Sequence, residues 1–369
     1  MRTLVVARPG EPEWRDAAEP SVEPGGFVVD TLYSGISAGT ELSYLKGTNP
    51  YLASTWDADA GVFRDHAPAE AFPITRLGYM EVARVRDTDT DAVAPGDVVA
   101  MTYGHASAYA AHPSRDRFVP LPNDVDPLLG VYVAHMGPIC ANGLLHAAAD
   151  LVGRDVRGLG DGVTGLHVLV TGAGVVGLLT GLFALHHGAA SVTVADPTPE
   201  RLAAARELGL EVADEREVEP WSLLKRRLRH GPGDCGADVA FQCRGRDGSL
   251  AAALRSLRPQ GTVIDLAFYQ GGAAEVRLGE EFHHNGLALR CAQIGRVPAG
   301  LAPAWTRERL SHETIGMLRA HGAAVLEHII TDVVAFADAP AVIADLAARR
   351  RQPIQAVFAM GPEREMTSS

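Results

Sequence analysis

The sequence predicts an α/β protein in which a β-rich domain, split along the chain, accompanies a doubly wound parallel sheet. Residues 1–148 contain short strand-like runs separated by Pro- and Gly-rich turns. From residue 149, strands alternate with helical spacing, which is typical of a parallel sheet covered by helices. A glycine-rich turn joins the first strand and helix of this second part. A chain of 369 residues is long enough for two domains.

The expected elements follow in chain order. In the first part we expect strands at 4–7, 27–33, 81–85 and 97–101. Residues 46–76 are polar and aromatic without a clear period, and they are longer than an ordinary connection, so they form either a covering loop or a locally mobile segment. We favour the covering loop.

The second part, residues 149–294, has five expected strands with helices at 199–208 and 249–257. The strands are expected at 168–170, 191–195, 238–242, 262–267 and 287–293. The tail, residues 295–369, is expected to return to the first domain. Its expected elements are a helix at 311–321, a strand at 325–330, a helix at 340–350 and a strand at 354–358.

Composition excludes several classes of function. With 45 acidic residues against 33 Lys and Arg, the net charge of −12 argues against nucleic acid as a partner. Four cysteines without a C-x-x-C pair indicate neither a disulfide framework nor a zinc knuckle, and they fit a reducing cytoplasm. The amino terminus lacks the apolar run of an export signal. Residues 168–185 are apolar enough to resemble a membrane span, but their four glycines favour a buried strand and helix, so no membrane partner is expected.

The glycine-rich turn has the spacing G-x-G-x-x-G at Gly172, Gly174 and Gly177. The first glycine permits a tight turn, the second lets the backbone approach a pyrophosphate, and the third lets helix pack against strand. Val175 and Val176 begin the helix, whose free N–H groups attract phosphates. A glycine turn without a ligand is the alternative.

A carboxylate at the end of the next strand strengthens this interpretation. Asp196 stands 24 positions after Gly172, where a side chain is needed to accept hydrogen bonds from the adenosine ribose. A 2′-phosphate would be repelled there, and Pro197 supplies no cation, so NAD is expected rather than NADP. Arg201, one turn further, leaves NADP possible.

Taken together, these motifs resemble the medium-chain dehydrogenase/reductase superfamily, the zinc alcohol dehydrogenase group. The matching segments are Gly35-Ile36 with Gly39-Thr40-Glu41-Leu42, Leu77-Gly78-Tyr79, residues 95–99, residues 120–122, the glycine turn, Asp196 with residues 199–202, and residues 236–243 with Gly245. The resemblance implies a GroES-like catalytic domain, split in sequence, around a Rossmann domain, with the cofactor in the cleft. It also implies cofactor contacts from Cys243, Arg244 and Phe268.

The chain departs from this family at the zinc ligands. The family's cysteine position is occupied by Ser37 or Ala38, depending on where one extra residue is placed, and its Gly-His-Glu is Gly78-Tyr79-Met80. The cysteine-rich lobe that binds structural zinc has no counterpart. Zinc prefers thiolate and imidazole ligands, so we expect no bound metal.

Without zinc, hydrogen-bonding side chains must polarise the substrate oxygen. Tyr79 and Thr40 are the first candidates, since they match positions that flank that oxygen in the family. His135, in an apolar run, is a candidate general acid. Tyr103 and His105 follow an expected strand and are further candidates. A packing role is the alternative for each of these aromatic and histidine side chains.

The sequence therefore predicts a zinc-independent oxidoreductase that moves a hydride between a nicotinamide and a secondary alcohol or ketone. A polyfunctional substrate such as a sugar, a cyclitol or a specialised-metabolite intermediate is suggested by the polar segment 46–76 and by residues 283–285. The alternatives are a reductase of an activated C=C bond and a dinucleotide-binding protein without turnover. A homodimer or homotetramer is expected.

Overall fold

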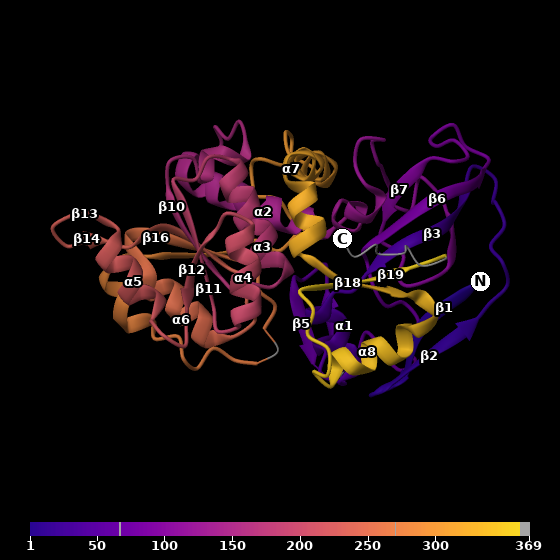
Figure 1. Ribbon diagram of the computed structural model, residues 1–369, viewed down its shortest axis with the longest axis horizontal. Coiled ribbons are helices and arrows are strands. Elements are labelled where there is room, and N and C mark those ends of the chain that lie inside the picture. Colours follow the sequence, from indigo (N-terminus) through magenta and orange to yellow (C-terminus); the bar gives the residue numbers. More distant parts are fainter. Residues whose placement is uncertain (66–67, 270, 362–369) are drawn as a thin grey trace. The chain divides into compact units, whose positions relative to one another are not determined.

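The computed structural model describes residues 1–65, 68–269 and 271–361, which form two compact units. The first unit comprises Met1–His135 together with the chain from Ile330 onward, and the second comprises Met136–Ile329. We expected the chain to change domains at residues 148/149 and 294/295. The units divide at His135/Met136 and Ile329/Ile330. Both parts of the first unit contribute strands to one sheet (Figure 1).

The first unit is built on a seven-stranded sheet of order β18-β19-β3-β6-β7-β9, with β8 also paired to β3. Its strands are β3 (Phe27–Gly35), β6 (Glu81–Thr88), β7 (Val98–Met101), β8 (Ala108–Ala111), β9 (Val119–Pro120), β18 (Ile330–Ala335) and β19 (Gln355–Ala359). Strand β19 pairs antiparallel with the carboxyl end of β3, so the tail closes the sheet beside the residues that lead into α1 (Ala38–Leu45).

The rest of the first unit packs around this sheet. Its elements are β1 (Arg2–Arg8), β2 (Glu11–Asp16), β4 (Ser54–Asp57), β5 (Val62–Asp65), α8 (Ala339–Ala347), and the 3₁₀ turns η1 (Pro50–Leu52), η2 (Pro127–Tyr132) and η5 (Phe336–Asp338). A core between β1, α1, α8 and β19 includes Leu4, Ile36, Ile343 and Phe358, all nearly inaccessible to solvent. This core holds the amino end of α1, which carries the candidate site residue Thr40.

The second unit contains a six-stranded parallel sheet of order β12-β11-β10-β15-β16-β17. Its strands are β10 (His167–Thr171), β11 (Ser191–Asp196), β12 (Glu211–Asp214), β15 (Ala237–Gln242), β16 (Leu257–Asp265) and β17 (Ala288–Cys291), with a separate hairpin of β13 (Arg229–Gly231) and β14 (Asp234–Cys235). The central strands are buried on both faces, which explains their continuous apolar runs.

Helices cover both faces of this sheet (Figure 1). One face carries α2 (Met136–Val152), α3 (Val175–His186), α4 (Pro199–Glu207) and α7 (Arg307–His328), and the other carries α5 (Pro220–Arg227) and α6 (Asp247–Ser256). The turns η3 (Leu159–Gly162) and η4 (Leu278–Phe282) complete the unit. Strand order reverses between β10 and β15, and ligands of open α/β sheets bind at the carboxyl ends of strands at such a point.

The predicted fold class is confirmed, as are the strands of both sheets that the sequence indicated, while one local expectation was wrong. The strand expected at 325–330 is wrong, because the Ala-rich stretch continues α7 to His328 and the β-branched run that follows forms β18. Residues 46–76, which we expect to form a covering loop, contain η1 and the β4–β5 hairpin. Elements without an expected counterpart include β2, β8, β12, α1 and α5.

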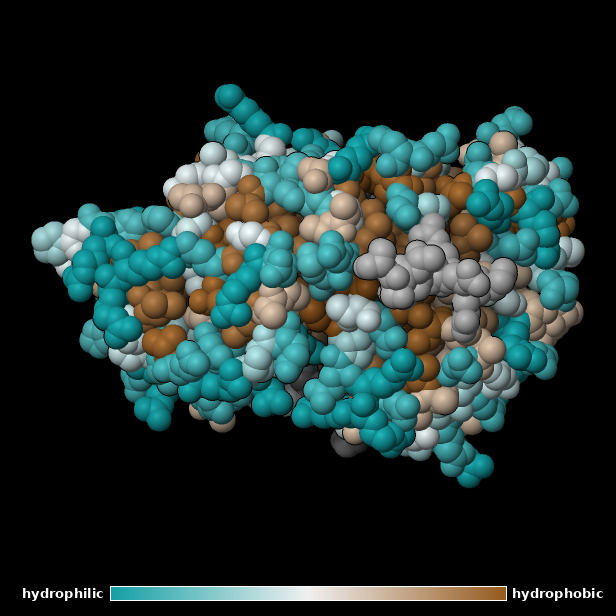
Figure 2. Space-filling view, viewed as in Figure 1, coloured by the Kyte–Doolittle hydropathy of each residue, from teal (hydrophilic) through white to brown (hydrophobic). Residues whose placement is uncertain are grey.

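Residues 168–185 form β10 and the buried helix α3, as expected. Within the three described ranges, no helix is both long and apolar enough to cross a membrane. Hydrophilic residues cover much of the face shown in Figure 2, with smaller apolar areas between them.

Candidate active site

The glycine turn lies in the second unit between β10 and α3, at the carboxyl edge of the sheet. Gly172 has φ +99°, which side chains rarely tolerate, and a Cβ on Gly177 would overlap the carbonyl oxygen of Gly172. Gly174 is the N-cap of α3, and a Cβ there would meet only Arg201 Nη1, at 3.9 Å. The turn therefore leaves open space at the first N–H groups of the helix, those of Val175 and Val176.

Asp196 stands at the end of β11 and is 2% exposed. Its Oδ2 accepts the Ala173 N–H at 2.9 Å and its Oδ1 accepts the Thr198 N–H at 2.8 Å. The carboxylate thus ties the glycine turn to the loop that starts α4, with Pro197 between. This is an additional role for the residue that the sequence assigned to the ribose.

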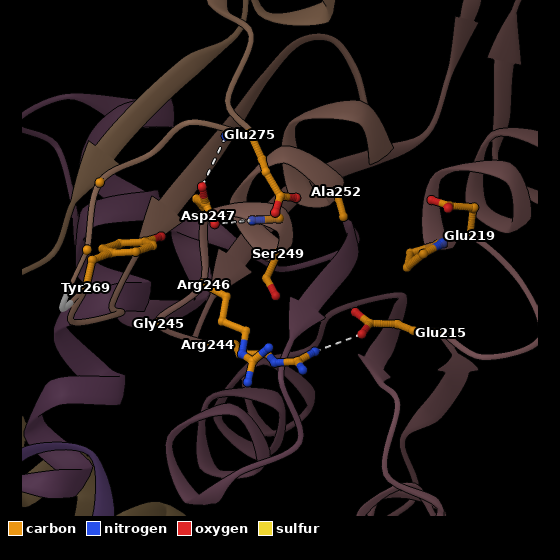
Figure 3. Close-up of a pocket in the computed structure, with 14 residues that line it drawn as sticks. Glu215, Glu219, Arg244, Gly245, Arg246, Asp247, Ser249, Ala252, Tyr269 and Glu275 are labelled. Carbon is orange, nitrogen blue, oxygen red and sulfur yellow. Dashed lines mark hydrogen bonds and ion pairs between the residues drawn. The ribbon is translucent and has the colours of Figure 1, made fainter. Parts of the chain in front are cut away.

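A cavity of about 510 Å³ opens at the carboxyl ends of β12 and β15, beside the amino ends of α5 and α6 (Figure 3). Arg244, one of the predicted cofactor contacts, lines it and forms an ion pair with Glu215 at 2.8 Å. Burial raises the pKa of Glu215, and Arg244 opposes that shift. Tyr269 and Asp247 also line the cavity.

The other two predicted cofactor contacts, Cys243 and Phe268, are sequence neighbours of the cavity-lining residues Arg244 and Tyr269. Cys243 follows β15, its Sγ lies 3.8 Å from the Phe241 carbonyl oxygen, and burial raises the pKa of its thiol, so it is held as a neutral thiol. Phe268 is 49% exposed, and its carbonyl stands against Gly245. Glu215 was not among the predicted site residues, because it follows β12, a strand that was not predicted.

These groups fit a dinucleotide. The turn has no Cβ where phosphates would approach, and helix N–H groups face that space. Asp196 ends β11, Arg201 lies in the first turn of α4, and Arg244 lies in the loop after β15. Residues 283–285, by contrast, lie at the opposite, amino-terminal edge, because Asn285 O accepts the Gln260 N–H near the start of β16. Their suggested contribution to the substrate site is therefore wrong.

The proton-transfer candidates lie in the first unit around the Tyr79 phenol. Tyr79 OH is hydrogen-bonded to Ser37 Oγ, and Thr40 Oγ1 lies 3.5 Å from the same oxygen. The His135 ring contacts the Tyr79 ring edge-to-face, with centroids 4.6 Å apart. Ser37 is the N-cap of α1 and Thr40 lies in its first turn, so the start of one helix brings both hydroxyls to the phenol.

Burial raises the pKa of Tyr79, while its hydrogen bonds to Ser37 and Thr40 act in the opposite direction. The phenol is therefore protonated at neutral pH and has a proton that it can donate. Three of the predicted catalytic residues, Tyr79, Thr40 and His135, are brought together here. Ser37 lies with them; it is one of the two residues that the resemblance places at the family's zinc-binding cysteine.

Tyr103 and His105 have other surroundings. Tyr103 is buried, its hydroxyl lies 2.6 Å from Thr31 Oγ1, and its ring stacks on Tyr109. His105 is fully buried, with Nε2 at 2.8 Å from Glu41 Oε2 and Nδ1 at 2.6 Å from Ser34 Oγ. In the sequence Glu41 is only part of a family motif. It is 64 residues from His105, so no local pattern predicts that the two side chains meet.

The donor set at the family's ligand positions does not fit zinc. Ser37 supplies a hydroxyl, Tyr79 a neutral phenol and Met80 a buried thioether in the apolar core. Zinc sites use thiolate, imidazole or carboxylate groups. Over residues 1–65, 68–269 and 271–361, no group of three or more such side chains is arranged to hold a metal.

Comparison with known proteins agrees with this architecture. The zinc-binding dehydrogenase family matches residues 175–298. D-guloside 3-dehydrogenase of Escherichia coli is 27% identical over 352 residues, covering 92% of this chain and 94% of that protein. Human sorbitol dehydrogenase is 35% identical over 104 residues, covering 28% of this chain and 29% of that protein.

Solved structures show the same fold. Galactitol-1-phosphate dehydrogenase from Escherichia coli has a TM-score of 0.74 at 17% identity, covering 97% of this chain and 100% of that chain. A putative zinc-binding dehydrogenase from Sinorhizobium meliloti, bound to NADP, has a TM-score of 0.71 at 19% identity, covering 97% of this chain and 98% of that chain.

Fold and sequence together define a nicotinamide-dependent oxidoreductase. The chain belongs to the medium-chain dehydrogenase/reductase superfamily, in the zinc alcohol dehydrogenase group, and is an NAD(P)-dependent dehydrogenase of that type.

Proposed function

We propose that this dehydrogenase works without zinc and interconverts a secondary alcohol and a ketone on a sugar, glycoside or related polyol. The observation that carries the proposal is the group of three hydroxyls, Ser37, Thr40 and Tyr79, at the place where zinc members of the family hold their metal. A relative over most of the chain, D-guloside 3-dehydrogenase, is named for action at a sugar ring position, which supports this substrate class.

The dinucleotide would be held by the glycine turn of Gly172, Gly174 and Gly177, with Asp196 and Arg201 beside it. When bound, its nicotinamide ring exchanges a hydride with the substrate carbon. Asp196 supports NAD over NADP, because a carboxylate repels a 2′-phosphate. The positive charges of Arg201 and Arg244 oppose this preference.

The chain's own residues handle the proton. In the direction of ketone reduction, the protonated Tyr79 transfers its O–H proton to the carbonyl oxygen. The phenolate that forms accepts hydrogen bonds from Ser37 and Thr40 until a proton from water restores the phenol. Alcohol oxidation reverses these transfers. Thr40 offers a second hydrogen bond to the developing charge, and His135 limits the position of the phenol ring by its edge contact.

A substrate panel with NAD and NADP tests this proposal. We expect the reduced cofactor to accumulate with glycosides and polyols that carry free secondary hydroxyls, and not with matched primary alcohols. Reduction of enones with no activity on any ketone would replace the proposal by C=C reduction. Cofactor binding without turnover on the whole panel would favour a non-catalytic dinucleotide-binding protein.

A further inference from the structure

A fully buried cluster of acid and imidazole groups lies behind the hydroxyls of the proposed site. Its members are Glu41 on α1, His105 after β7, Ser34 on β3 and Glu81 on β6, and each is at most 1% exposed. Buried charges cost free energy unless they are paired and hydrogen-bonded. A packing role alone would be served by apolar side chains, so the contacts of this cluster need an explanation.

Glu41 connects the cluster to the proposed site through its two carboxylate oxygens. Oε1 accepts the backbone N–H of Ser37 at 2.7 Å, and Oε2 lies 2.8 Å from His105 Nε2. The hydroxyl of the same Ser37 bonds the Tyr79 phenol. One carboxylate therefore holds the residue that holds Tyr79.

The hydrogen bonds define where the protons lie. The Ser34 hydroxyl has a single proton, which it donates to Glu81 Oε1 at 3.0 Å, so His105 Nδ1 donates to Ser34 Oγ across 2.6 Å. Nε2 faces a carboxylate oxygen and also donates. An imidazole that donates from both nitrogens is a cation, and its negative partner is Glu41.

The second carboxylate, that of Glu81, has different surroundings. Glu81 Oε2 is buried without a hydrogen-bond partner in the described part of the chain, and burial raises the pKa of Glu81. Burial by itself would lower the pKa of His105, but Glu41 and then Glu81 raise it above its ordinary value. Glu41, whose Oε2 contacts the imidazole directly, is therefore the ion-pair partner of His105.

We propose that Glu41 and His105 are positioning residues for the Tyr79 phenol: the buried pair holds the Ser37 backbone, and so aims the Ser37 hydroxyl that orients Tyr79. This inference rests on the proposed function of Tyr79 in proton transfer. It assigns His105 a role that differs from direct contact with substrate. Without the pair, Ser37 keeps its hydroxyl but loses the acceptor that fixes its N–H.

A double-mutant cycle on the full chain tests the proposal. Glu41→Ala is made in the natural chain and in Tyr79→Phe, and kcat, KM and cofactor affinity are measured for each protein. Glu41→Gln is the conservative variant, because its amide oxygen still accepts the Ser37 N–H. Asp116→Ala is the matched control, since Asp116 also accepts one backbone N–H and one side-chain donor, from His112 and Tyr109, both at 2.9 Å.

If Glu41 acts through Tyr79, Glu41→Ala lowers kcat by about tenfold or more, because a small misplacement of a reacting group has effects of this size. The same substitution then changes the residual kcat of Tyr79→Phe by about twofold at most, since effects of residues that act as a unit are not additive. We expect Glu41→Gln to recover most of kcat, Asp116→Ala to retain it, and KM and cofactor affinity to change little.

Equal losses from Glu41→Ala in both backgrounds would overturn the positioning role while leaving the proposed function intact. Natural turnover in Tyr79→Phe itself would instead overturn the proposed function, and the positioning role with it. Circular dichroism verifies that each variant is folded. Should Glu41→Ala fail to fold, His105→Gln, which retains a donor toward Glu41, replaces it in the same cycle with the same two expectations.

Discussion

Replacement of Tyr79 by phenylalanine removes one oxygen from the centre of the proposed site and little else. The ring and its edge contact with His135 remain, and the lost hydrogen bond to Ser37 lowers the free energy of unfolding by about 1 kcal/mol. The variant should therefore fold. Its cofactor affinity should be unchanged, since the glycine turn belongs to the other unit.

Turnover should fall by about 10²-fold, the lower end of the range for general acid–base catalysis, because the Ser37 and Thr40 hydroxyls remain to bond the substrate oxygen. A loss of that size corresponds to about 2.7 kcal/mol of transition-state stabilisation.

The assay is steady-state reduction of the cofactor with the best substrate of the panel, at saturating cofactor. Tyr109→Phe is the matched control, because the Tyr109 phenol is also hydrogen-bonded, to Asp116 at 2.9 Å, but belongs to a separate cluster. Tyr79→Phe with natural kcat, or an equal loss in Tyr109→Phe, would refute the reasoning.

Four further expectations concern other residues of the chain. His135→Ala should lower kcat by about 10²-fold with little change in cofactor affinity, because loss of its edge contact lets the Tyr79 ring move from its reactive position; natural kcat would remove His135 from the site. Elemental analysis of protein purified without chelator should find well under one zinc per chain, and a tightly held zinc whose removal abolishes activity would contradict the donor-set argument. NAD should bind more tightly than NADP at equal salt, and Asp196→Asn, which keeps the side-chain shape, should narrow the difference by about tenfold; tighter NADP binding by the natural chain would show that the arginines outweigh Asp196. Burial lowers the pKa of His187 to about 4, below the value near 6.5 of an unfolded chain, so unfolding takes up a proton and the free energy of unfolding should fall, by about 1 kcal/mol after allowance for solvent screening, as pH drops from about 6.5 to about 4; His187→Gln should flatten that part of the unfolding profile, and an unchanged profile would contradict the assignment.

The sequence by itself determined what depends on neighbours along the chain. Continuous β-branched runs mark β10 and β11 because both faces of these strands are buried, and the glycine turn between β10 and α3 has a spacing that backbone geometry requires. Asp196 is found from the same local frame, at the end of the next strand. The loss of the family's zinc ligands is likewise visible in two short motifs, at Ser37 and Tyr79.

Only the tertiary structure decided which side chains meet. Ser37 and Tyr79 are 42 residues apart and Glu41 and His105 are 64 apart, so no periodicity links them, and the packing of α1 against the sheet brings them together. The same packing separates two tyrosines that look alike in sequence. The Tyr79 hydroxyl lies beside the hydroxyls of Ser37 and Thr40 at the start of α1, whereas the Tyr103 hydroxyl is hydrogen-bonded to Thr31 inside the sheet. Periodicity describes which face of an element is buried, but the partner that buries it comes from elsewhere in the chain, and for this protein that partner determines whether a phenol or an imidazole can reach a substrate.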